Sequence, residues 1–142
     1  MKRLFTALVL VIGLAGCAGT NPVKPALESR RPELVAYALE GSYTIVQGKA
    51  LEFASDPQTP AAAVQVIKTV DAKANPILDA SKPLALEAKK LREDVATCSG
   101  DPVCATKEDR LASLLKQLDG MIDEVAPLIN SLLDALAGGV AP

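Results

Sequence analysis

Three segments of the chain repeat apolar residues in alternating steps of three and four positions, the spacing that places side chains on one face of an α-helix. The first runs from Pro32 to Ser55, and the second from Pro60 to Thr97. The third begins near Thr106 and ends before Gly138-Gly139. The pattern predicts an all-α fold, a three-helix bundle that runs up, down and up.

The same stripes predict which side chains face the core. In the first helix they are Val35, Leu39, Ser42, Val46, Ala50 and Phe53. In the second they are Ala63, Ile67, Val70, Ala74, Ile77, Ser81, Leu84, Ala88, Leu91 and Val95. In the third they are Leu111, Leu115, Leu118, Ile122, Val125, Ile129, Leu132 and Leu136, widened by Leu114, Met121 and Leu128. A seven-residue period over four heptads indicates heptad-type, knobs-into-holes packing.

Two prolines, Pro76 and Pro83, lie inside the second segment. A proline in a helix interior costs about 3 kcal/mol. The apolar stripe nevertheless continues through both positions, and both fall on the opposite side of the helix. We therefore expect one long, bent central helix with the prolines on its outer side. The alternative is a break at Asn75, with Pro76 opening a new helix.

Helix ends are predicted from capping residues. Thr59 suits an N-cap before a first-turn proline at Pro60. Thr106, with Asp109 three residues later, is similar to a capping box and marks the start of the third helix. Gly138-Gly139 marks its end, and Pro127 predicts a local kink.

Two glycines, Gly41 and Gly48, lie seven residues apart on one side of the first helix. Glycine costs up to about 1 kcal/mol in a helix interior, so the pair calls for a reason. We expect a neighbouring backbone to approach closely there. A ligand groove is the alternative.

The first residues have the layout of an export signal. Lys2 and Arg3 precede an apolar stretch from Leu4 to Ala15. The stretch is shorter than the ~20 residues that span a bilayer core of ~30 Å. It leads into Leu14-Ala15-Gly16-Cys17, which resembles the lipobox of bacterial lipoproteins.

The resemblance implies that the Cys17 thiol receives a diacylglycerol, that signal peptidase II cuts before it, and that the new amine is acylated. Two or more acyl chains hold a protein stably on a membrane. Residues 1–16 would be the signal peptide, 17–31 the lipidated cysteine and its tether, 32–138 the bundle and 139–142 a tail. Similarity to enterobacterial lipoproteins favours the outer membrane, facing the periplasm, because Ala18 stands where Asp signals inner-membrane retention. The inner membrane is the less favoured alternative.

Cys98 and Cys104 bracket a short turn-forming segment between the second and third helices. In an exported protein such a pair predicts a disulfide. With Cys17 lipidated, all three cysteines are then used. A redox-active pair is the alternative, although such pairs usually have only two residues between the sulfurs.

The amino-acid composition excludes several kinds of catalytic and binding site. The 142 residues include no histidine, which excludes Ser-His-Asp and Cys-His catalysis and imidazole metal sites. With 17 acidic and 15 basic residues, there is no positive field to hold nucleic acid. No catalytic, metal-binding or cofactor motif is present, so we expect no catalytic residues, no metal and no cofactor.

The end of the hairpin formed by the second and third helices has a surplus of apolar residues. The first helix is expected to cover the second only as far as Pro83. The leucines left without a third layer are Leu84, Leu86, Leu91, Leu111, Leu114 and Leu115. An excess of apolar surface indicates an interaction site. We expect the tether, a second copy, an envelope protein or the lipid surface to cover it.

Two functions remain. The first is a non-catalytic envelope lipoprotein that acts as a helical interaction or structural module, attached to the membrane through acylated Cys17. The second is a carrier of a small molecule or lipid. A carrier would hold its apolar ligand between bent helices near Gly41, Gly48, Pro76 and Pro83.

Overall fold

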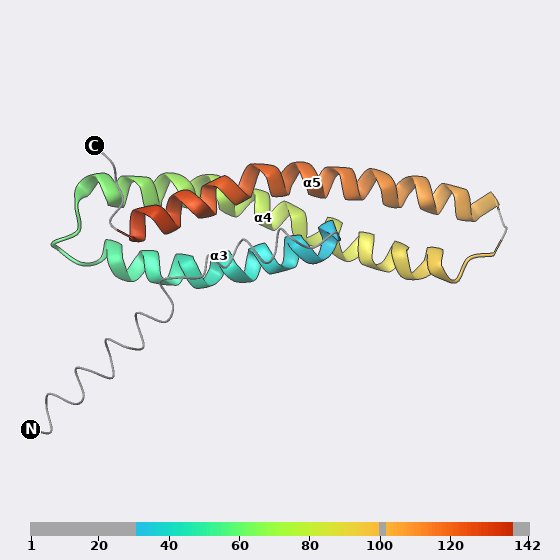
Figure 1. The fold of residues 1–142 in the computed structure, drawn as a ribbon, viewed down its shortest axis with the longest axis horizontal. Coiled ribbons are helices and arrows are strands. Elements are labelled where there is room, and N and C mark those ends of the chain that lie inside the picture. Colours follow the sequence, from blue (N-terminus) through green and yellow to red (C-terminus); the bar gives the residue numbers. More distant parts are fainter. Residues whose placement is uncertain (1–30, 100–101, 138–142) are drawn as a thin grey trace, which may run out of the picture.

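The computed structural model describes residues 31–99 and 102–137, which form three helices. Helix α3 spans Pro32–Ala54, α4 spans Ala61–Ala96 and α5 spans Pro102–Leu136. Successive helices run in opposite directions, and α3 lies along one side of the longer α4–α5 hairpin (Figure 1). The predicted all-α, up-down-up bundle is confirmed.

The turn between α3 and α4 is closed by side chains, in a different way from the predicted cap. The Thr59 hydroxyl donates to the carbonyl of Phe53, 2.5 Å away, and so bonds the end of α3 instead of the start of α4. The N–H of Gln58 donates to the Asp56 carboxylate at 2.8 Å. Pro60 occupies the N-cap position of α4 without a side-chain bond. The assignment of Thr59 as the N-cap was therefore wrong.

Helix α5 begins four residues earlier than predicted. Pro102 occupies its first turn, where the missing N–H of proline costs nothing. Thr106 thus lies inside the helix, and its role as an N-cap is not observed. The predicted stop at Gly138-Gly139 lies outside the described residues.

Helix α4 continues through both prolines, as predicted, and no break occurs at Asn75. Pro76 and Pro83 are exposed. A helical proline leaves the carbonyl four residues earlier without its N–H partner. Here those carbonyls belong to Ala72 and Asp79, which are also exposed, so water can take the place of the missing bond.

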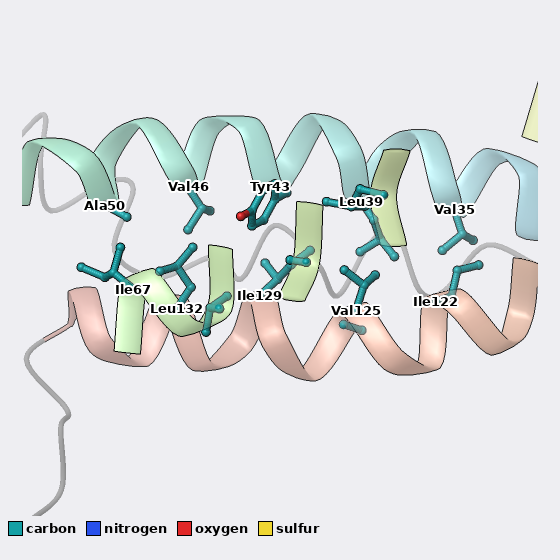
Figure 2. Close-up of a cluster of buried hydrophobic side chains, with 14 residues drawn as sticks. Val35, Leu39, Tyr43, Val46, Ala50, Ile67, Ile122, Val125, Ile129 and Leu132 are labelled. Atoms are coloured by element: carbon teal, nitrogen blue, oxygen red, sulfur yellow. The ribbon is translucent and has the colours of Figure 1, made fainter. Parts of the chain in front are cut away.

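The main core cluster fills the space where all three helices meet (Figure 2). Its buried members are Val35, Leu39, Tyr43, Val46, Ala50, Ile67, Val70, Ala74, Leu78, Ile122, Val125, Ala126, Ile129 and Leu132. Figure 2 shows side chains of α3 pointing towards those of α5. Because the centre is closed by side chains from every helix, burial in this cluster joins the three helices into one body.

The buried stripes follow the predicted ones but drift by one position in places. Leu78 and Ala85 are buried where Ile77 and Leu84 were predicted, and these two are half-buried. In α5, Ala135 is buried where Leu136 was predicted. Leu114 is buried as predicted, whereas Leu115 is half-buried. In α4 the cause is the 3.6-residue turn, which slips about 20° per heptad against a strict seven-residue repeat and so moves the buried position forward by one.

One core position of α3 was also misplaced. Tyr43 is buried, whereas Ser42 is half-buried and donates its hydroxyl to the carbonyl of Ala38. Phe53 is only partly buried against the main cluster. Tyr43 takes the buried position because its aromatic ring provides far more apolar area for the core than the side chain of Ser42.

A second cluster lies further along the α4–α5 hairpin. It contains Ala36, Ala85, Ala88, Leu111, Leu114 and Leu118, with Leu84, Leu91 and Leu115 packed against it. Near the hairpin end, Lys107 bonds Asp94 at 3.4 Å. A disulfide joins Cys98 to Cys104, whose Cα atoms are 5.9 Å apart, which confirms the predicted pairing.

Replacement of Leu118 with alanine tests the second cluster. Leu118 is fully buried, so Leu118→Ala should lower the free energy of unfolding by about 2–5 kcal/mol through lost burial and a cavity. Leu86→Ala is the control, because this leucine is largely exposed. Chemical denaturation followed by circular dichroism measures both changes. Equal, small losses would contradict the described packing.

Candidate interaction surface

The described residues offer no evident centre for chemistry. Within residues 31–99 and 102–137, no group of three or more Cys, Asp or Glu side chains is placed to hold a metal ion. None of the helices in these ranges is both long and apolar enough to cross a membrane. Cys17, the predicted lipidation site, lies outside the described residues. The surfaces of the helices are therefore the remaining candidates for a functional site.

The six leucines of the predicted hairpin interface do not form an exposed patch. Leu111 and Leu114 are buried, and Leu84, Leu91 and Leu115 pack partly buried against the second cluster. Only Leu86 is largely exposed, at 61%.

The reason is that α3 reaches further along α4 than predicted. Ala36 belongs to the same cluster as Ala85 and Ala88, and Glu33 contacts Arg92. The expectation that α3 covers α4 only to Pro83 was therefore wrong. Because the third layer extends past Pro83, it covers most of the apolar side chains that were expected to be open.

The exposed apolar residues gather instead on α3. Leu34 is 42% exposed, Tyr37 39%, Ile45 65% and Leu51 59%. Together with Gly41 and Gly48, they follow one another in steps of three and four, so they share one side of the helix. We call this set of six residues the outer face of α3. It points away from the main cluster, which takes the opposite side of the helix.

The two glycines lie in the middle of this outer face. A Cβ atom added at Gly41 or Gly48 would meet nothing within 4 Å. Among the residues that the structure describes, the expected close approach of a neighbouring backbone is therefore not found. Both positions are open to whatever packs against α3 from outside.

The start of α3 is attached to α4 by a buried carboxylate. The Glu33 side chain is 0% exposed. Arg92 donates from Nε to Oε1 at 2.7 Å and from Nη2 to Oε2 at 3.1 Å. Arg31 donates from Nε to Oε1 at 3.1 Å. A bidentate arginine is the geometry that best compensates a buried carboxylate.

These contacts determine the charge state of Glu33. Burial would raise the pKa of its carboxyl group, but the hydrogen bonds from Arg92, the backbone and Arg31, together with the positive charge of Arg92, outweigh burial. The pKa of Glu33 therefore lies below its ordinary value. The carboxylate is ionised at neutral pH and needs its arginine partners.

Three further polar contacts join α3 to α4. The Tyr43 hydroxyl donates to Asp71 Oδ1 at 2.6 Å, and the Gln47 side-chain amide donates to the same oxygen. Burial, the hydrogen bond and the charge of Asp71 raise the pKa of Tyr43. Nearer the surface, Lys82 pairs with Glu40 at 2.9 Å. Polar contacts thus lie on the side of α3 that faces α4, and Glu52, four positions after Gly48, brings a charge to the outer side.

The outer face of α3 was not predicted, although the sequence contains a signal for it. Residues 32–54 contain just four charged side chains, Glu33, Glu40, Lys49 and Glu52. A helix with one buried face normally carries charged residues over the opposite side. The scarcity of charge, together with Leu34, Ile45 and Leu51 outside the predicted stripe, was the available signal for a second apolar face.

The chain matches no protein-family model, and no curated protein or solved structure shows significant similarity to it.

The Glu33 contacts predict a specific pH dependence. Because the pKa of Glu33 is depressed in the folded state, its contribution to stability is present above the unfolded-state value of about 4.3. The contribution is lost as the pH falls through the folded-state pKa. At pH 7, Glu33→Gln should lower the free energy of unfolding by about 1–3 kcal/mol, as for a lost charged hydrogen bond.

Denaturant unfolding between pH 7 and pH 3 measures this effect. The difference between the wild-type protein and Glu33→Gln should narrow as the pH falls. Glu40→Gln is a matched control on the same helix, since its pair with Lys82 is partly exposed and should contribute little. A gap that stays constant over the whole pH range would show that folding does not lower the pKa of Glu33.

Proposed function

We propose that the chain is a non-catalytic lipoprotein of the bacterial envelope that acts as a helical interaction module. In this proposal acylated Cys17 holds it on the periplasmic face of the outer membrane, and the bundle presents the outer face of α3 to another protein surface. The observation that carries the proposal is this apolar outer face. An apolar stripe on a helix that is already packed on its other side has no use within the described bundle.

The cysteines support export of the protein. The motif Leu14-Ala15-Gly16-Cys17 follows a short apolar stretch, and Cys98 is bonded to Cys104. Disulfides persist in oxidising compartments such as the periplasm and are rare in the cytosol. One lipidated cysteine and one disulfide give every cysteine of the chain a role that fits the envelope.

The alternative of a ligand carrier has less support. It placed an apolar cleft near Gly41, Gly48, Pro76 and Pro83, but all four residues are exposed on the outer sides of their helices. The interior between the helices is occupied by the side chains of the main cluster. We therefore favour an interaction surface over an internal ligand site.

Metabolic labelling with a palmitate analogue tests the anchor. The full chain, expressed with its own leader in a bacterial host, should incorporate the label and appear in the outer-membrane fraction. Cys17→Ser should abolish the label, because it removes the only thiol that the lipobox presents for acylation. Cys98→Ser combined with Cys104→Ser is the control and should keep it. A wild-type chain without label, or a labelled Cys17→Ser variant, would contradict the proposal.

A further inference from the structure

We draw no further inference here: the strongest candidate, the apolar outer face of α3, carries none because nothing in the structure shows what covers it.

Discussion

The position of α3 depends on one buried carboxylate. The Glu33 side chain is completely buried and accepts hydrogen bonds from Nε and Nη2 of Arg92, so the first turn of α3 must lie beside that part of α4. This places Ala36 in the second cluster. The same contact therefore determines how much of the hairpin is covered and which side of α3 remains outside.

Helix α3 consequently serves two surfaces. Its inner side contributes Leu39 and Tyr43 to the main cluster, and its polar contacts are directed to α4 through Glu33 and the Tyr43–Asp71 bond. Few charges remain for the outer side, which is apolar and open at its glycines. A helix that is apolar on both sides is expected where a bundle is one layer of a larger assembly. The hairpin end, in contrast, is closed by the Cys98–Cys104 disulfide and by core side chains.

Periodicity in the sequence was sufficient for the helices and for the continuity of α4 through Pro76 and Pro83, because exposed prolines leave the buried stripe undisturbed. It was not sufficient for features that depend on tertiary contacts. A strict seven-residue repeat cannot anticipate the drift that buries Leu78 in place of Ile77. The ion pair of Glu33 with Arg92 spans 59 positions, and nothing local distinguishes Glu33 from an ordinary first-turn acid. The predicted interface at the hairpin end was wrong for the same reason, because it depended on how far α3 extends along α4, which is a tertiary contact.

Amide hydrogen exchange along α3 tests most directly whether this helix is held over its whole length. If Glu33 and Ala36 attach the first turns to the hairpin, residues 36–42 should exchange within about tenfold of residues 43–50, because both stretches open together with the bundle. Exchange of residues 36–42 at the rate of an unprotected peptide, beside a protected second half of α3, would show that the buried carboxylate does not hold the start of the helix.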